Sequence, residues 1–303
     1  MSPPTTIVSR NVDSGLLERS LVGAKSMGLA HAASLGILVP PALVITVPAC
    51  LGFRERGSFD DSVLASIGES LSVLEDECGR RLGDPSDPLL VSVRASAVEP
   101  MPTMLAAVLD VGIDLDVPEV MEAWTSRGFA NNCRDRFVQS YRAVTGEIAP
   151  SNPFAQLQGA IEAVLASWDD DPAQAYRRMR GIDHGAGMAV MVQAMVFGNR
   201  NERSGAGVVM SRSPTTGEPG LCGDFLVSAQ GDEVGAGSRD VRPIDELADL
   251  PPGTADELVR VMALLEAEAT DLLTVDFTVD DGRLHVLQVD AGAHSAEWRD
   301  EIR

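Results

Sequence analysis

The pattern of apolar and polar positions predicts a mixed first half and a sheet-rich second half. Helical periodicity is expected at residues 24–35, 58–81, 128–144 and 254–270, and through most of 151–180. Apolar or alternating runs predict strands at residues 42–46, 89–94, 188–197, 207–211, 224–229, 274–279 and 284–289. The order of these elements predicts an α+β protein.

The stretch from Ser26 to Phe53 contains no Asp, Glu, Lys or Arg, which raises the question of a membrane span. Pro40, Pro41 and Pro48 argue against one, because proline does not allow a continuous helix through this stretch. Residues 1–13 also lack the apolar core of a secretion signal. We therefore expect no membrane partner and no export.

Composition narrows the choice of partners and compartment. The 303 residues are 45% apolar, enough for a sizeable core in two or three lobes, and carry a formal net charge of −21. This charge repels nucleic acids and anionic membranes. The four cysteines are far apart, without zinc or CxxC spacing. A reducing cytoplasm is the expected location.

Lys25 is the only lysine in the chain, among 24 lysine and arginine residues. Lysine is a compact charge on a flexible stem that can follow a phosphoryl group, whereas the arginine guanidinium is bulky and planar. The small residues 23–26 stand where a helix is expected to begin, and backbone N–H groups there favour anions. We predict that Lys25 binds phosphate; the alternative is a surface lysine left by chance.

Arg94 stands at the end of the apolar strand expected at residues 89–94 and is followed by small residues. Ligands of α/β sheets bind near strand ends. Arg94 is therefore a second candidate for an anionic ligand. By itself, it is better explained as an ordinary exposed arginine at the end of a strand.

A hairpin is expected at residues 274–289, with its turn at 280–282. A three-residue loop with Gly282 in the left-handed conformation would place Asp276 and Gln288 on the same face, whereas a two-residue loop would place them on opposite faces. A carboxylate and an amide on adjacent strands can hold Mg²⁺ against phosphate oxygens. An exposed hairpin without a metal remains an equal alternative.

The lysine turn and the strand-end arginine belong to a longer series of motifs. The series runs through residues 23–29, 38–41, 90–95, 134–141, 192–199, 204–208, 211–218 and 229–231. It resembles the N-terminal nucleotide-binding domain of the pyruvate phosphate dikinase and phosphoenolpyruvate synthase family, here as a stand-alone chain. The resemblance extends nearly from end to end.

The resemblance implies an ATP-grasp fold, in which two α/β lobes clasp a nucleotide. The expected boundaries are an N-terminal lobe at residues 1–110, a helical connecting segment at 111–185 and a C-terminal lobe at 186–303. In this family, ATP phosphorylates a histidine on a separate swivelling domain. ATP and Mg²⁺ are thus the expected cofactors, and a phosphohistidine-carrying protein or a small molecule is the expected acceptor.

The resemblance also assigns roles to individual residues. Lys25 and Arg94 would bind the ATP phosphates and take part in catalysis, and Asp276 and Gln288 would form the metal side of the site. The other residues expected to contact the nucleotide are Arg136, Gln193, Ala194, Met195 and Val196.

Several positions depart from the family pattern. Thr274 stands where the family has a second acidic residue, and Asp290 stands where it has an arginine. Residues 100–107 keep a Met-Pro pair but lack the glycine and the acidic and hydroxyl residues of the family's phosphate loop. These changes make the expected pocket more negative, which weakens triphosphate binding unless another group compensates.

Three functions are compatible with these residues. The first is an ATP-dependent phosphotransferase subunit that acts on a histidine of a separate protein. The second is a stand-alone small-molecule kinase or ligase of specialised metabolism. The third is a non-catalytic nucleotide sensor or scaffold, which the altered metal site favours.

Overall fold

The computed structural model describes residues 2–10, 17–116, 127–236, 240–268 and 272–291. Its contacts divide the chain into two compact units. Unit 1 comprises Met1–Met27 and Pro41–Met195, and unit 2 comprises Gly28–Pro40 and Val196–Arg303. Among the described residues, no helix combines the length and the apolar character needed to span a membrane.

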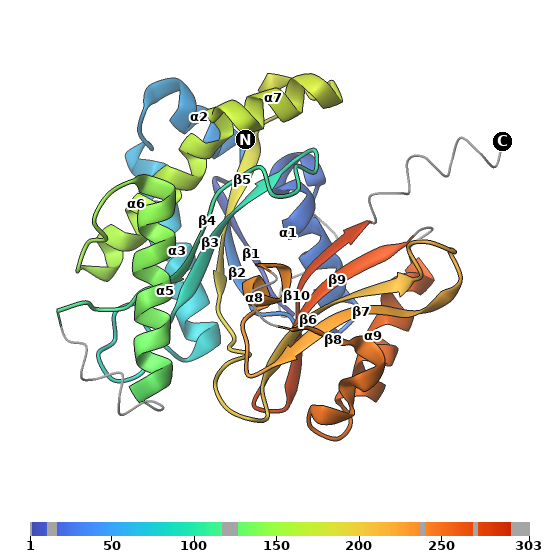
Figure 1. Ribbon diagram of the computed structural model, residues 1–303. Helices are drawn as coiled ribbons and strands as arrows, with labels where there is room; N and C mark the ends of the chain where they lie inside the picture. Colours follow the sequence, from blue (N-terminus) through green and yellow to red (C-terminus); the bar gives the residue numbers. More distant parts are fainter. Residues whose placement is uncertain (1, 11–16, 117–126, 237–239, 269–271, 292–303) are drawn as a thin grey trace. The chain divides into compact units, whose positions relative to one another are not determined.

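Unit 1 contains a five-stranded antiparallel sheet in the order β1-β2-β5-β3-β4 (Figure 1). Its strands are β1 (Thr5–Val8), β2 (Ala42–Ile45), β3 (Val91–Ala97), β4 (Ala107–Val111) and β5 (Met188–Ala194). The central strand β5 is buried at every position, as is β2. Apart from Gln193 in β5, their sequences are continuously apolar, which fits strands covered on both faces.

Helices surround this sheet in unit 1. They are the first part of α1 (Arg19–Ser34), α2 (Val47–Arg56), α3 (Asp61–Cys78), α5 (Arg127–Thr145), α6 (Pro153–Ala166) and α7 (Asp171–Arg180). Helix α6 begins at Asn152, whose side chain accepts hydrogen bonds from the backbone N–H groups of Phe154 and Ala155. It contacts β3, β4 and β5, so the sheet and α6 bury a common core.

The buried Arg177 side chain fastens α7 to the end of α6. Arg177 is 2% exposed, donates from Nη1 to the Trp168 carbonyl oxygen at 2.7 Å and places Nη2 2.8 Å from His184 Nδ1. Its Cζ atom lies 4.1 Å from the centroid of the Trp168 ring. Hydrogen bonds and stacking on the indole together compensate for burying the guanidinium.

Unit 2 contains a second five-stranded antiparallel sheet, in the order β10-β9-β6-β7-β8. Its strands are β6 (Gly205–Arg212), β7 (Pro219–Val227), β8 (Arg242–Pro243), β9 (Leu273–Asp280) and β10 (Arg283–Ala291). Helix α8 (Gly231–Ala236) is short, and α9 (Thr254–Glu268) contacts β6, β9 and β10. Buried residues of α9 recur at helical spacing, at Leu258, Val261, Met262 and Leu265.

The α+β class is confirmed, and the expected elements form with boundaries shifted by a few residues. Helices α2 and α8 and strands β1, β4 and β8 were not expected. Helix α2 was missed because Pro48 was interpreted as a break, although proline fits the first turn of a helix, where its missing N–H has no helical partner. Strands β1 and β4 have only four and five residues, too few for a clear periodic signal.

The expected connecting segment, residues 111–185, contributes α5, α6 and α7, which belong to unit 1. Residues 28–40, expected in the N-terminal lobe, belong to unit 2. The three-part division of the chain stays a prediction.

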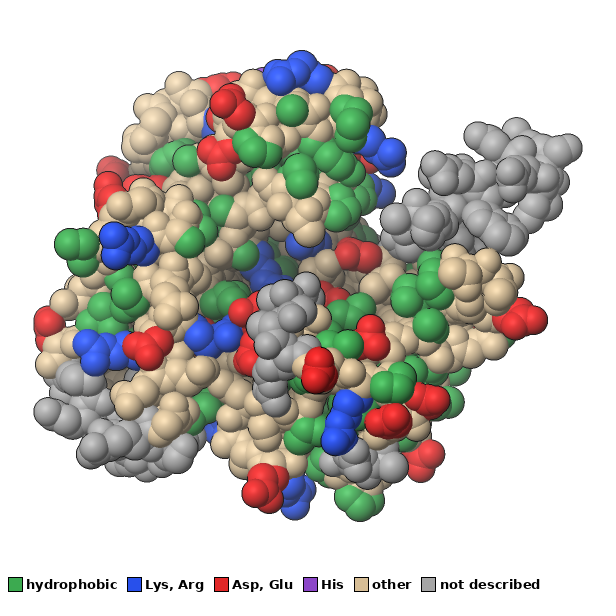
Figure 2. Space-filling view, in the orientation of Figure 1, with side chains coloured by type: hydrophobic (Ala, Val, Ile, Leu, Met, Phe, Trp, Pro, Cys, Tyr) green, Lys and Arg blue, Asp and Glu red, His purple; other side chains and the backbone are tan. Residues whose placement is uncertain are grey.

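Charged side chains of both signs are mixed over the face seen in Figure 2, where the basic groups form no continuous surface. Several of the described arginines are paired with carboxylates, including Arg54 with Asp169 at 3.0 Å and Arg212 with Glu266 at 2.7 Å. Much of the positive charge is thus locally neutralised. The expected absence of a nucleic-acid partner stays a prediction.

Replacing Arg177 with methionine should lower the free energy of unfolding by about 2–4 kcal/mol, because the Trp168 carbonyl group loses its buried donor and the indole loses its stacked partner. Arg178 is the adjacent, exposed arginine of the same helix. Arg178→Met should change stability by less than about 0.5 kcal/mol. Urea unfolding of both variants tests the difference; equal midpoints would show that Arg177 is not a structural anchor.

Candidate functional site

Lys25 lies just after a break in helix α1. Gly23 has φ 76° and ψ 170°, so the helix stops there and resumes before Lys25. The break rests on β3: the Ser26 N–H donates to Ser96 Oγ at 3.1 Å, and Ser96 Oγ donates to the Val22 carbonyl oxygen at 2.8 Å. The sequence-predicted turn therefore exists, and its position is set by contacts with a strand.

Arg94 is half-buried on the same strand, β3. Side chains two residues apart along a strand point to the same face of a sheet. Ser92, Arg94 and Ser96 thus share one face, while the other face carries Val91, Val93 and other apolar side chains. Since Ser96 holds the Lys25 turn, the structure places that turn over the face that carries Arg94.

Gln193 joins this face from the neighbouring strand β5. It is 2% exposed and lies opposite Ser92 on one side and Ala42 on the other. Directly opposed residues of antiparallel strands have side chains on the same face. Three of the predicted site residues of unit 1, Lys25, Arg94 and Gln193, are therefore organised by one face of its sheet.

The backbone beyond Gln193 continues the strand pairing. The Ala194 N–H donates to the Pro41 carbonyl oxygen and the Met195 N–H to the Leu90 carbonyl oxygen, both at 2.9 Å. Val196 begins the long segment of unit 2. The roles predicted for Ala194, Met195 and Val196 at the nucleotide stay predictions.

Arg136 has a structural partner on β4. Its Nε lies 3.5 Å from Asp110 Oδ2; the Asp110 side chain is fully buried, and that of Arg136 is 14% exposed. Asp110 has a positive φ of 56°, near the irregularity in the pairing of β4 with β3. The ion pair explains Arg136 without a ligand, and its contact with nucleotide stays a prediction.

In the hairpin β9–β10 the expected loop length is wrong, but Asp276 and Gln288 still lie on the same face. Arg283 pairs with Asp280, so the loop has two residues rather than the expected three. A regular hairpin would then separate Asp276 and Gln288 onto opposite faces. A bulge between Val286 and Gln288 shifts the register by one residue, so Gln288 lies directly opposite Asp276.

Gln288 is oriented by a neighbour on its own strand. Its amide nitrogen Nε2 donates a hydrogen bond to Asp290 Oδ2. Asp290 was expected only to add negative charge to the site. Its carboxylate also takes up the donor end of the Gln288 amide, which leaves the amide oxygen available as an acceptor or metal ligand.

Asp280 holds the glycine-containing loop after β5 against this hairpin. Its Oδ1 lies 2.7 Å from Arg200 Nε, and its Oδ2 accepts from Arg200 Nη2 and from the Phe197 N–H, both at 3.1 Å. A charge-assisted hydrogen bond within an ion pair is stronger than a bond between neutral groups. The start of this loop is thus attached to unit 2.

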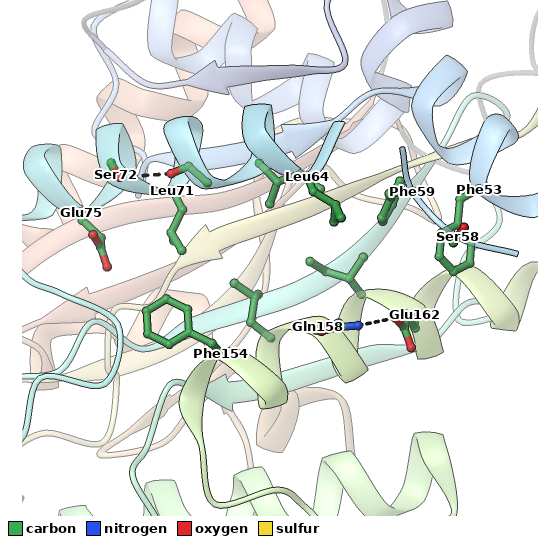
Figure 3. Close-up of a pocket in the computed structure, with 14 residues that line it drawn as sticks. Phe53, Ser58, Phe59, Leu64, Leu71, Ser72, Glu75, Phe154, Gln158 and Glu162 are labelled. Carbon is green, nitrogen blue, oxygen red and sulfur yellow. Dashed lines mark hydrogen bonds between the residues drawn. The ribbon is translucent and has the colours of Figure 1, made fainter. Parts of the chain in front are cut away.

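A separate apolar cavity of about 460 Å³ lies in unit 1 (Figure 3). Apolar side chains of α2, α3 and α6 dominate its lining, among them Phe53, Leu64, Leu71, Phe154, Leu157 and Ile161. None of the sequence-predicted site residues lines it. Apolar walls without a cationic group do not suit a triphosphate, so the cavity is no part of the expected site.

Residues 57–241 match the family model described as the pyruvate phosphate dikinase AMP/ATP-binding domain. The chain belongs to this family. Arg94, Arg136 and Gln193–Val196 lie inside the matched range, whereas Lys25, Asp276 and Gln288 lie outside it. Membership supports the ATP-grasp assignment and makes ATP the expected nucleotide.

Whole pyruvate phosphate dikinases are much longer than this chain. The enzymes of Mesembryanthemum crystallinum and Arabidopsis thaliana are 35% identical over 92% of this chain and 34% of their own length. The Clostridium symbiosum enzyme is 33% identical over 92% of this chain and 38% of its own. This chain therefore spans little more than a third of these relatives.

Among solved structures, D-alanyl-alanine synthetase A from Vibrio cholerae aligns with 89% of this chain and 58% of its own, at 11% identity and a TM-score of 0.37. A score of this size does not carry a fold assignment. Family membership and the two antiparallel sheets carry it instead.

For this member of the pyruvate phosphate dikinase family, Asp276 and Gln288 fit a Mg²⁺ ion bound together with phosphate. Mg²⁺ in phosphate-transfer sites is commonly held by one or two carboxylates plus substrate oxygens. Asp276 supplies one carboxylate, and the fixed Gln288 amide supplies one oxygen. Within the described residues, no group of three or more His, Cys, Asp or Glu side chains could hold a metal.

Sequence reasoning missed the residues that position the site. Ser96, Asp110 and the bulge at Leu287 have no motif, because their roles depend on contacts between distant segments. The positive φ of Gly23 could have been suspected from a glycine before the predicted helix. The Ser96 contact could not.

The free energy of unfolding should fall as the pH drops from about 6.5 to 4, in part through His285. Burial lowers the pKa of His285 to about 4, because the charged imidazole is poorly solvated there. In the unfolded chain it titrates near its ordinary pKa of about 6.5. The unfolded state binds more protons in this window, so His285 removes up to about 3 kcal/mol there.

Denaturant unfolding of wild type and His285→Gln at several pH values tests this. The variant should have the flatter pH dependence between about 4 and 6.5. Parallel curves would show that His285 is not kept neutral by the fold.

Proposed function

We propose that this chain is an ATP-dependent phosphotransferase subunit that passes a phosphoryl group of ATP to a histidine on a separate protein. Family membership supports ATP as the donor. The observation that carries the proposal is the attachment of the Lys25 turn, through Ser96, to the sheet face that carries Arg94. Two cations of different geometry are thus organised around one surface.

The proposed roles follow from the chemistry of phosphoryl transfer. The bond between the transferred phosphorus and the oxygen that bridges it to the rest of the nucleotide breaks, and a bond from that phosphorus to an imidazole nitrogen of the acceptor forms. The remaining nucleotide leaves with the bridging oxygen, and the acceptor nitrogen becomes phosphorylated. Because charge spreads over the transferring oxygens, catalysis consists mainly of positioning and charge neutralisation.

Lys25 and Arg94 supply the protein's positive charge in this proposal. Arg94 holds phosphate oxygens through its planar fork, and Lys25 follows the transferring group on its flexible stem. Asp276 and Gln288 hold Mg²⁺, which neutralises phosphate charge when bound. Gln193 lies on the Arg94 face and contributes to the nucleotide pocket, together with the backbone at Ala194–Val196.

A non-catalytic nucleotide sensor is the second candidate, and one observation favours it. The candidate metal site has a single carboxylate at Asp276, and Asp290 engages Gln288 where the family has an arginine. With one carboxylate fewer to hold the metal and one arginine fewer to contact the phosphates, the site loses stabilisation of the transition state more directly than affinity for the nucleotide. A small-molecule acceptor remains compatible with the same residues.

ATP or ADP with Mg²⁺ should raise the thermal unfolding midpoint, because a ligand that binds only the folded state stabilises it by about 2.7 kcal/mol at one hundred times its Kd. Asp276→Asn should reduce the dependence of this shift on Mg²⁺. Asp224 lies on the same face, across Val208 from Asp276, and Asp224→Asn is the matched control. It should behave as wild type.

No midpoint shift at millimolar nucleotide would overturn the proposed function but not the fold. A shift of equal size with and without Mg²⁺ would show that Asp276 is not a metal ligand. That result would favour the sensor.

Lys25→Ala should lower phosphoryl transfer by roughly a hundredfold or more, because it removes a preorganised positive charge from the transferring group. Nucleotide affinity should fall less. Lys25→Arg should not restore the rate, since a guanidinium cannot take the position of the ammonium. Arg178→Ala, which removes an exposed positive charge elsewhere, controls for net charge.

The measurement is transfer from radiolabelled ATP to candidate histidine-containing acceptors, with wild type and variants side by side. Equal rates for wild type and Lys25→Ala would contradict the role of Lys25. No transfer from any of the proteins, with nucleotide binding intact, would favour the sensor.

A further inference from the structure

Helix α1 lacks one of its own hydrogen bonds at the Gly23 break. In a continuous α-helix, the Ser26 N–H would donate to the Val22 carbonyl oxygen, four residues earlier. Here the two groups are joined through the Ser96 hydroxyl, which accepts from Ser26 N at 3.1 Å and donates to Val22 O at 2.8 Å. One side chain from β3 therefore stands in for the missing helical bond.

The packing around this bridge is tight. A Cβ atom on Gly23 would lie 1.8 Å from the Ser96 carbonyl oxygen and 2.5 Å from Ser96 Oγ. Ser26 and Ser96 are both fully buried. Water therefore has little access to replace the hydroxyl, and its loss would leave a buried N–H and a buried C=O without their shared partner.

The bridge also fixes Lys25 to the strand of Arg94. Lys25 directly precedes Ser26, and Arg94 lies two residues before Ser96 on the same face of β3. Same-face positions along a strand are about 6.6 Å apart. The strand and the Ser96 hydroxyl group thus fix the distance between the backbone positions from which the two cationic side chains extend.

We propose that Ser96 is a positioning residue that sets Lys25 relative to Arg94, an inference that rests on the proposed binding of phosphate by these two residues. Ser96 itself does not touch the nucleotide in this proposal. Its hydroxyl holds the turn so that the ammonium and the guanidinium can engage one polyphosphate. Without it, the Lys25 turn relaxes and the two cations lose their common register.

Ser26 provides a matched control within the same turn. Its own hydroxyl oxygen is buried and makes no hydrogen bond with any described residue, whereas its backbone N–H forms the bridge. Ser26→Ala therefore removes a buried hydroxyl and keeps the bridge. Ser96→Ala removes a buried hydroxyl and breaks it.

The first measurement is the affinity of the whole chain for MgADP by titration calorimetry. Ser96→Ala should bind at least about tenfold more weakly than wild type, because the cations are no longer preorganised. Ser26→Ala should remain within about twofold. Ser96→Cys, which refills the site with a weaker donor and acceptor, should also be weakened and serves if Ser96→Ala does not fold.

The second measurement uses the fact that Lys25 is the only lysine. Reductive ¹³C-methylation keeps the charge and yields one lysine resonance, with the terminal amine as an internal reference. In wild type and Ser26→Ala, the resonance should have one position and shift with MgADP. In the Ser96 variants, its position without nucleotide should move towards that of unfolded protein, and the MgADP-induced shift should shrink.

Two outcomes would overturn the inference. Ser96→Ala could lower the unfolding midpoint while leaving MgADP affinity and the Lys25 resonance as in wild type, which would make the hydroxyl a stabilising group only. Alternatively, Ser26→Ala could reproduce every effect of Ser96→Ala. If wild type binds no MgADP, the proposed function fails, and the nucleotide-free Lys25 resonance still decides whether Ser96 positions it.

Discussion

The arrangement of unit 1 around its predicted phosphate-binding residues depends on a close approach of two backbones. Gly23 lies so close to the Ser96 carbonyl group that a Cβ atom at position 23 would clash with the carbonyl oxygen. The approach interrupts helix α1 and brings its resumed first turn against β3. Helix N-termini and the Lys25 ammonium group both attract anions. The close packing of Gly23 therefore determines where positive potential lies on this face of the sheet.

Unit 2 depends on a comparable local adjustment, in its hairpin. The two-residue loop alone would direct Asp276 and Gln288 to opposite faces, and the bulge cancels this effect within a few residues. Bulges redirect side chains at little cost elsewhere in a sheet. The hydrogen bond from Gln288 to Asp290 then orients the amide. In each unit, the candidate site residues thus depend on an irregularity in an otherwise regular element.

Much of the fold was predictable from the sequence, because long apolar periodicities survive in most contexts. The strands β5 and β9 and the helices α6 and α9 appear where their patterns placed them. Helix α2 was not predicted, because a proline such as Pro48 can either interrupt a helix or occupy its first turn, and only the residues that follow distinguish the two cases. The predicted length of the hairpin loop was also wrong. Asp281 and Gly282 both adopt positive φ and form a two-residue turn, so Asp280 remains in the strand. The residue types of the candidate site could be predicted, but not the contacts that orient them, such as Ser96 to Val22, which join distant parts of the chain.

The way in which the chain is divided between the units also has a consequence for its synthesis. Unit 2 takes residues 28–40 from near the beginning of the chain, and there the Val286 N–H of β10 donates to the Leu38 carbonyl oxygen at 2.9 Å. The native partner of Leu38 therefore exists only after residue 286 has left the ribosome, whereas every strand of unit 1 is complete by residue 194. Such long-range pairing is slow and leaves apolar segments exposed meanwhile. The apolar segment containing Ile37, Leu38 and Val39 accordingly needs protection from aggregation during much of the synthesis.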